Sequence, residues 1–244
     1  MSFYRTIAAD AVLRETMLLR LTLPTLALTA LAAAPAHAGP ILNPVKPCYV
    51  AATEDQREPV AIDGWNFTPF ATVSVYVDDI EVQLDPPPQA DFDGTLHGTV
   101  AAPYIDGDQR RFTVRVVEQA NQGNTAAVSA LVTRLMVEQT PERASTKQKV
   151  RFRGRGFTNL TEPVYAHYVY AGRSRKTIKI GLPTGDCGRF SIKRKQFPFK
   201  SSPRVGLWTI QFDQTAKYDP KASPRVPLTI RVSKQVKRPR AQAR

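Results

Sequence analysis

The stretches "VAIDGWNFT" (residues 60–68) and "VRFRGRGFT" (residues 150–158) decide the fold of this chain, because they are two copies of one pattern. They share the form V-x-[IF]-x-G-x-[NG]-F-T. Further matches follow in the same order at slightly larger offsets, ending with "FTVRV" (112–116) against "WTIQF" (208–212). A kept order with small changes of offset indicates an internal repeat, here with a period of roughly ninety residues.

Each copy also alternates between apolar and polar positions. In the second copy Val150 and Phe152 are apolar, whereas Lys149, Arg151 and Arg153 are charged. A period of two predicts a strand buried on one face only. Similar segments recur between turn signals such as "AGRS" and "TGDCG". The pattern predicts an all-β chain of two tandem immunoglobulin-like antiparallel β-sandwiches, with about seven strands each.

We expect Arg151 and Arg153 to lie on the outward face of the second strand of the second copy. Residues 150–153 form that strand, and Gly154 and Gly156 are expected to end it. A disordered Arg-Gly segment is the alternative, but such segments lack the apolar alternation seen here.

The N-terminus is typical of a secretory signal peptide. An uncharged, mostly apolar run at residues 21–34 follows Arg20 and precedes Ala36-His37-Ala38, which predicts cleavage before Gly39. A retained N-terminal membrane anchor is the alternative, and Met17 is an alternative start. No later window is long and apolar enough for a membrane span, so none is expected after cleavage. The predicted parts are a signal peptide (1–38), an acidic domain (45–134), a basic domain (135–233) and a disordered basic tail (234–244).

The shared pattern resembles the early strand of bacterial immunoglobulin-like domains, especially the IPT/TIG type. The segments "RRFTVRV" and "GLWTIQF" look like the penultimate strand of such domains. The resemblance covers residues 45–233 and implies the sandwich fold. It implies little about function, since members act as spacers, adhesin stalks, accessory modules of enzymes or DNA-contacting domains. They share no catalytic residues, so none is carried over to this chain.

The two copies carry opposite net charge. Residues 39–140 contain 6 Lys or Arg and 14 Asp or Glu, a net charge of −8. Residues 141–244 contain 25 and 5, a net charge of +20. Such asymmetry bears on partners and association rather than on the fold.

Strand parity predicts where the positive charge of the second domain gathers. We expect one sheet to hold strands A, B, E and D, with outward Arg151 and Arg153 on B, Lys179 on D, and Arg189 and Lys193 on E. Ordinary solubilising charge explains one or two of these residues. Five of one sign on a single face are better explained by an anionic ligand, because like charges opposite each other destabilise a sheet.

The segment "KRKQFPFKSSPR" (193–204) interleaves basic and aromatic residues. Phe197 has no aromatic counterpart in the first copy. It either fills the core or stacks on a base or sugar of the ligand, and it is therefore a further candidate site residue. The basic tail either grips an anionic polymer or is only a solvated chain end.

Catalysis finds no support in the sequence. His97 and His167 lie in strand patterns of different copies, with no nucleophile, zinc or phosphate-loop motif near either. The Asp-Gly segments at 91–94 and 106–108 resemble fragments of calcium loops but lack the late glutamate. We therefore predict no enzyme activity, no metal site and no cofactor.

The two cysteines, Cys48 and Cys187, fall in different copies. They are either two separate thiols or a disulfide between the domains, in an oxidising compartment if the chain is secreted. Separate thiols are favoured, because Cys48 is expected at the pole far from the linker and Cys187 near the junction. A bond would then need the two copies to lie side by side.

These observations support two hypotheses on function. The first is a non-catalytic binding module, secreted or at the cell surface. Its basic second domain would engage an anionic cell-wall polymer or extracellular nucleic acid. The alternative is a structural envelope protein that self-associates through its acidic and basic domains.

Overall fold

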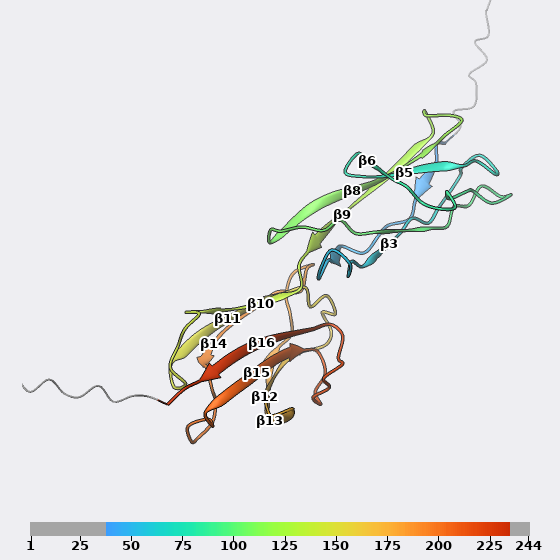
Figure 1. The fold of residues 1–244 in the computed structure, drawn as a ribbon. Helices are drawn as coiled ribbons and strands as arrows, with labels where there is room; N and C mark the ends of the chain where they lie inside the picture. Colours follow the sequence, from blue (N-terminus) through green and yellow to red (C-terminus); the bar gives the residue numbers. More distant parts are fainter. Residues whose placement is uncertain (1–37, 235–244) are drawn as a thin grey trace, which may run out of the picture. The chain divides into compact units, whose positions relative to one another are not determined.

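The computed structural model describes residues 38–234, in which every regular element is a β-strand. The strands form two immunoglobulin-like β-sandwiches, each with its own hydrophobic core, so the predicted all-β fold is confirmed (Figure 1). The predicted signal peptide and tail lie, apart from Ala38 and Lys234, outside the described residues. No helix of residues 38–234 is long and apolar enough to cross a membrane.

The first sandwich pairs one large sheet with two short ladders. The large sheet has the order β2-β9-β8-β5-β6, and the ladders β1-β4 and β3-β7 form the second layer. Its strands are β1 (Ile41–Leu42), β2 (Cys48–Val50), β3 (Pro59–Ala61), β4 (Gly64–Trp65), β5 (Val73–Val77), β6 (Ile80–Val82), β7 (Thr99–Ala101), β8 (Gln109–Glu118) and β9 (Thr125–Thr133).

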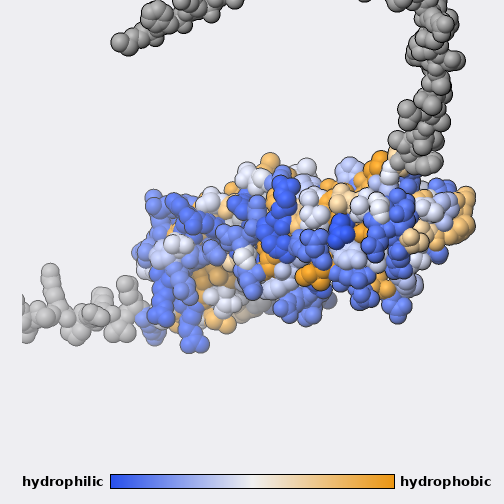
Figure 2. All heavy atoms as spheres, turned by 90° about the horizontal axis from the view of Figure 1, so that it is seen from above, coloured by the Kyte–Doolittle hydropathy of each residue, from blue (hydrophilic) through white to orange (hydrophobic). Residues whose placement is uncertain are grey.

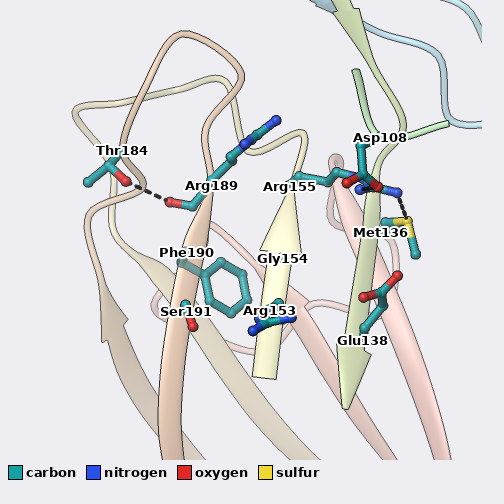
Figure 3. A pocket seen from close by; sticks show the side chains of 10 residues that line it. All are labelled: Asp108, Met136, Glu138, Arg153, Gly154, Arg155, Thr184, Arg189, Phe190 and Ser191. Carbon is teal, nitrogen blue, oxygen red and sulfur yellow. Dashed lines mark hydrogen bonds and ion pairs between the residues drawn. The ribbon is translucent and has the colours of Figure 1, made fainter. Parts of the chain in front are cut away.

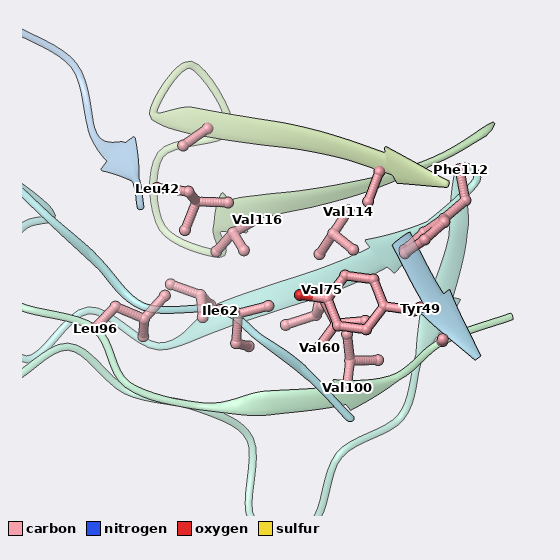
Figure 4. Close-up of a cluster of buried hydrophobic side chains, with 14 of the residues drawn as sticks. Leu42, Tyr49, Val60, Ile62, Val75, Leu96, Val100, Phe112, Val114 and Val116 are labelled. Atoms are coloured by element: carbon pink, nitrogen blue, oxygen red, sulfur yellow. The ribbon is translucent and has the colours of Figure 1, made fainter. Parts of the chain in front are cut away.

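The core of the first sandwich is built by the apolar half of each alternating strand. Figure 4 shows valines of β5 and β8 facing Val60 and Val100 of the opposite layer, with the ring of Tyr49 among them. Tyr49 packs edge-on against Phe112, with ring centroids 5.9 Å apart. Burying one face of each strand is what the period-two pattern predicts.

The N-terminal strand of the first sandwich changes layers. Its first part, β1, pairs with β4, and after Pro44 and Pro47 its second part, β2, joins the large sheet beside β9. This is a parallel pair, with Cys48 opposite Leu131. Because the strands run the same way, Cys48 lies near the end of β9, from which the chain enters the second sandwich.

The second sandwich has two antiparallel sheets with the orders β10-β11-β14 and β13-β12-β15-β16. Its aromatic core includes the buried side chains of Phe152, Phe157 and Phe212. The strands are β10 (Met136–Thr140), β11 (Lys149–Arg155), β12 (Val164–Tyr170), β13 (Arg173–Gly181), β14 (Phe190–Lys195), β15 (Gly206–Asp213) and β16 (Arg225–Val232).

The repeat seen in the sequence is also a repeat of backbone geometry. Gly94 and Gly188 both have positive φ, at 78° and 55°. In each copy the glycine carbonyl accepts a hydrogen bond from the pattern's phenylalanine, Phe67 or Phe157. A Cβ atom added to either glycine would overlap the carbonyl oxygen of that same phenylalanine. Only glycine tolerates both constraints, so the two loops require it for one physical reason.

The end of the arginine-rich strand differs from the prediction. β11 continues through Gly154 to Arg155, so Gly154 does not end it. Gly154 is instead needed for packing, because an added Cβ would overlap the ring of Phe190. The strand ends at Arg155, just before Gly156, whose φ is 87°, and the matching Asn66 has a φ of 66°. Asparagine is among the few other residues that adopt this left-handed conformation readily.

The strand after β12 lies in a different sheet from the one predicted for Lys179. A turn of only two residues, Ala171 and Gly172, joins β12 to β13, and both have positive φ. This is the geometry of a tight β-hairpin, which forces β13 to pair with β12. β13 and its Lys179 therefore belong to the sheet opposite β11 and β14.

Candidate functional site

The outer surface of β11 and β14 carries the cations predicted for the ligand face. The register places Lys149 opposite Lys195 and Arg151 opposite Lys193. Arg153 follows on β11, opposite Ser191, and all five cationic side chains are exposed. We call these five residues the cationic face. Among residues 38–234, none of the five lies within 4.0 Å of a carboxylate.

Protection of a free sheet edge explains only part of this charge. β14 is the last strand of its sheet, and lysines on edge strands prevent pairing with other chains. β11, however, lies between β10 and β14, so Arg151 and Arg153 protect no edge. Two like-charged pairs directly opposite each other cost roughly 0.2–1 kcal/mol each in the absence of a counter-ion. An anion bound across both strands would relieve that repulsion.

A hollow of about 320 Å³ lies at the end of the cationic face nearest the first sandwich. Figure 3 shows side chains from β10, β11 and β14 around it, with Asp108 of the first sandwich at its edge. Arg153, Arg155 and Arg189 line this arginine hollow together with Glu138. Three guanidinium groups against two carboxylates leave its lining positive.

Arg155 connects the arginine hollow to the first sandwich. Its guanidinium forms an ion pair with Asp108, while its Nε is buried and has no hydrogen-bond partner among residues 38–234. Nearby, Arg189 donates a hydrogen bond to the side-chain oxygen of Gln109. A buried donor without an acceptor costs roughly 1–3 kcal/mol.

The structure brings together some of the predicted site residues and separates others. Arg151, Arg153 and Lys193 share the cationic face, and Arg189 lies at the rim of the arginine hollow. Lys179 is on β13 of the opposite sheet, so the prediction that it shares their face is wrong. The tight hairpin before β13 is the physical reason.

Phe197 is a core residue rather than a ligand contact. Only 3% of its surface is exposed, and its ring packs against Tyr168, Trp208 and Phe199. No base or sugar can stack on a ring covered in this way, so the structure corrects its inclusion among the site residues. The extra aromatic fills volume in a core richer in large rings than that of the first sandwich.

Cys48 and Cys187 are joined by a disulfide, with Cα atoms 5.2 Å apart. The expectation that Cys48 lies far from the linker is wrong, because parallel pairing of β2 with β9 places it beside the connection instead. Cys187 lies in the turn before β14, where its carbonyl accepts a hydrogen bond from the amide of Gly156. The bond thus holds the first sandwich to the loop that begins the cationic strand β14.

Sequence reasoning missed Lys149, Lys195 and Arg155 as site residues. Lys149 and Arg155 have the same parity as Arg151 on β11, and Lys195 has the parity of Lys193 on β14. Extending the alternation by one step at each strand end would have found all three. The hollow itself depends on Asp108 of the other copy, for which the sequence holds no signal.

His167 is buried in a polar cluster on the opposite sheet. Its Nε2 lies 3.1 Å from Oδ1 of Asp213, and its Nδ1 lies 2.9 Å from the hydroxyl of Thr177. Burial alone would raise the pKa of Asp213, but hydrogen bonds from His167, Gln211 and Thr215 hold it below its usual value. Every polar group named here has a partner, as is usual for polar groups that are buried for structural reasons.

No protein-family model matches this chain, and no curated protein does. Among solved structures, the chain is similar to titin immunoglobulin tandem domains. The identity is 12%, the TM-score is 0.25, and 81% of this chain and 97% of that chain are covered. A DUF3823 family protein from Bacteroides ovatus is 10% identical, with a TM-score of 0.25 over 78% and 99% of the two chains.

A third solved structure is SGBP-B of the Bacteroides ovatus mixed-linkage glucan utilization locus, in complex with a mixed-linkage heptasaccharide. The identity is 14%, the TM-score is 0.23, and 80% of this chain and 48% of that chain are covered. Likeness at this level carries no argument about ligands. The surface itself is the better guide, and the face seen in Figure 2 is mostly hydrophilic, with hydrophobic side chains in small separate groups.

Proposed function

We propose that this chain is a non-catalytic binding module of the bacterial envelope, secreted or at the cell surface, whose second sandwich binds an anionic polymer. The observation that carries the proposal is the pair of like-charged contacts on β11 and β14, Lys149–Lys195 and Arg151–Lys193. A repeating anion, whether a wall phosphate, a uronate or a nucleic-acid backbone, matches a row of cations along two strands. The IPT/TIG-type resemblance remains a prediction.

The arginine hollow gives the polymer a fixed point. One phosphate or carboxylate there would meet the guanidinium groups of Arg153 and Arg189. Guanidinium groups suit this task because their planar forks match both anions. The remaining charges of the polymer would then run along the cationic face.

The disulfide supports the proposed location. Such bonds persist in oxidising compartments and are rare in the cytosol of most organisms. The Cys48–Cys187 bond is buried at both residues, so it belongs to the folded core of the chain rather than to a reactive surface thiol pair. This agrees with the signal peptide predicted from the sequence.

The test is retention on heparin, polygalacturonate and DNA as the salt concentration rises. Binding through the cationic face should fall steeply with log salt, by a slope of about 0.9 for each phosphate contacted on duplex DNA. The triple variant Arg151→Gln/Arg153→Gln/Lys193→Gln should reduce the slope by about 2 to 3.

A matched control removes the same charge elsewhere. Arg173→Gln/Lys179→Gln/Arg231→Gln neutralises three exposed cations of β13 and β16, on the other sheet. Its slope should change by less than about 1. Equal losses for the two triple variants would show that net charge rather than the face governs binding, and would reject the proposal.

Self-association through the opposite charges is the alternative. Part of that complementarity is already used within one chain, by the ion pair of Arg155 with Asp108. Sedimentation at low and high salt separates the two functions. A monomer at low salt, in the absence of ligand, rejects the structural role. Salt-sensitive oligomers that do not bind the polymers reject the binding module.

A further inference from the structure

A second hollow in the second sandwich is formed by aromatic and basic residues together. It has a volume of about 270 Å³ and lies where the loop between β14 and β15 meets the ends of β12 and β15. Its walls are the aromatic rings of Tyr170, Phe199 and Trp208, and its cations are Arg175 and Arg204. None of these residues belongs to the cationic face or the arginine hollow.

The loop that forms one wall is held in place by three side chains. Lys176 donates a hydrogen bond to the carbonyl of Pro198 (2.8 Å), Trp208 to that of Arg204 (2.9 Å), and Tyr170 to that of Val205 (3.0 Å). The aromatic hollow is therefore formed before any ligand arrives. A preformed site avoids the entropy cost of ordering a loop on binding.

No residue that lines the aromatic hollow is acidic. Residues 163–185 and 187–212, which include every residue that lines it, contain no Asp or Glu. Hydroxyl groups are present instead, from Ser201 and Ser202. The site thus offers two guanidinium groups, two hydroxyls and an apolar wall, with no built-in counter-ion.

The arrangement of the three rings disfavours a ligand that stacks through a nucleic-acid base. Trp208 is largely covered, with its ring centroid 4.9 Å from that of Tyr170 and 5.3 Å from that of Phe199. Base stacking needs an open aromatic face, and Trp208, with only 4% of its surface exposed, does not offer one. A volume just below the roughly 300–1,000 Å³ of common small-molecule sites fits a single ring.

The geometry points to a site for one anionic sugar unit, a hexose ring that bears a carboxylate or a phosphate. The anion binds Arg175 and Arg204, the apolar face of the sugar lies against the partly exposed rings of Tyr170 and Phe199, and its hydroxyls meet Ser201 and Ser202. Charge-assisted bonds to guanidinium groups supply the affinity, and the hydroxyl contacts distinguish a sugar from a simple anion.

Trp208 provides a direct reporter. The chain has two tryptophans, and Trp65 lies on the first sandwich with 44% of its surface exposed, so Trp65→Phe leaves Trp208 as the sole indole. Titration with glucuronate or glucose 6-phosphate should change its emission in a saturable way, in the millimolar range. Which of the two binds more tightly identifies the anion. Glucose, acetate and inorganic phosphate should each bind at least tenfold more weakly.

The variants Arg175→Gln and Arg204→Gln should each weaken the response about tenfold, whereas Arg231→Gln, an exposed arginine of β16, should leave it unchanged. A response to inorganic phosphate as strong as that to the sugars overturns the sugar site. So does a response to a mononucleotide alone. The triple variant of the cationic face should titrate normally, so this site and the polymer-binding function can fail independently.

Discussion

The disulfide between Cys48 and Cys187 should contribute a large share of the stability of the chain. The two residues are 139 positions apart, so the bond closes a loop that contains most of the first sandwich and four strands of the second. Chain-entropy arguments for a loop of that length give about 5 kcal/mol, and removal of native disulfides costs about 2–5 kcal/mol. Alanine is the appropriate replacement, since both cysteines are buried.

The perturbation is therefore Cys48→Ala/Cys187→Ala, measured by urea unfolding. The two tryptophans lie in separate sandwiches, Trp65 on the first and Trp208 in the core of the second, and single-tryptophan variants separate their signals. A loss of about 3–5 kcal/mol at an m-value of about 2 kcal/mol/M lowers the midpoint by about 1.5–2.5 M. The midpoint reported by each tryptophan should fall, because the bond restrains the unfolded chain of either sandwich.

Reduced wild-type protein is the control. Its midpoint should match that of the double variant, and reductant should have no further effect on the variant. A midpoint within about 0.3 M of the oxidised wild type, for either probe, would refute the reasoning for that sandwich. It would mean that the bond adds nothing to a junction already fixed by other contacts.

Three further predictions concern single residues. Gly188→Ala should destabilise the chain by more than about 1 kcal/mol, because of its positive φ and the overlap with Phe157, whereas Gly107→Ala, with open space around it, should be near neutral in urea unfolding. Tyr168→Phe should raise the free energy of unfolding by about 1 kcal/mol, because the hydroxyl is buried with no hydrogen-bond partner in the described part of the chain and burial raises the pKa of Tyr168 to about 12; a loss of similar size would contradict this. The lowered pKa of Asp213 stabilises the folded state above the unfolded value of 3.8, and this contribution is lost as the pH falls through the folded pKa. Asp213→Asn should therefore lower the melting temperature at pH 7, and the difference in melting temperature between the variant and the wild type should be smaller at pH 2. The same difference at both pH values would refute the linkage.

The sequence was sufficient for the strands, the repeat and most of the cationic face. These depend on local alternation and on glycine positions, which a pattern such as that of residues 150–158 records directly. The prediction for Lys179 is wrong because it rests on the strand order of one immunoglobulin topology. The two-residue turn at Ala171-Gly172 indicates the correct sheet, because so short a connection forms a hairpin and makes β13 pair with β12.

The remaining errors arose from contacts distant in the sequence. Whether Phe197 faces inward depends on the rings around it, and no local pattern distinguishes an extra core aromatic from an exposed one. The position of Cys48 depended on a strand that changes layers at two prolines and then runs parallel to β9. The arginine hollow needs Asp108 beside Arg155, a pairing that only the folded chain creates.

The same disulfide makes a covalent ring of the chain from Cys48 to Cys187. A protease that cuts any one peptide bond inside this ring, for example in the exposed loop that contains Glu54 and Asp55, opens the ring without releasing a fragment. The nicked molecule would be heavier by only one water, and its two pieces would separate only after the disulfide is reduced under denaturing conditions. For a chain exposed to extracellular proteases, the first cut would therefore leave the cationic strands still attached to the first sandwich.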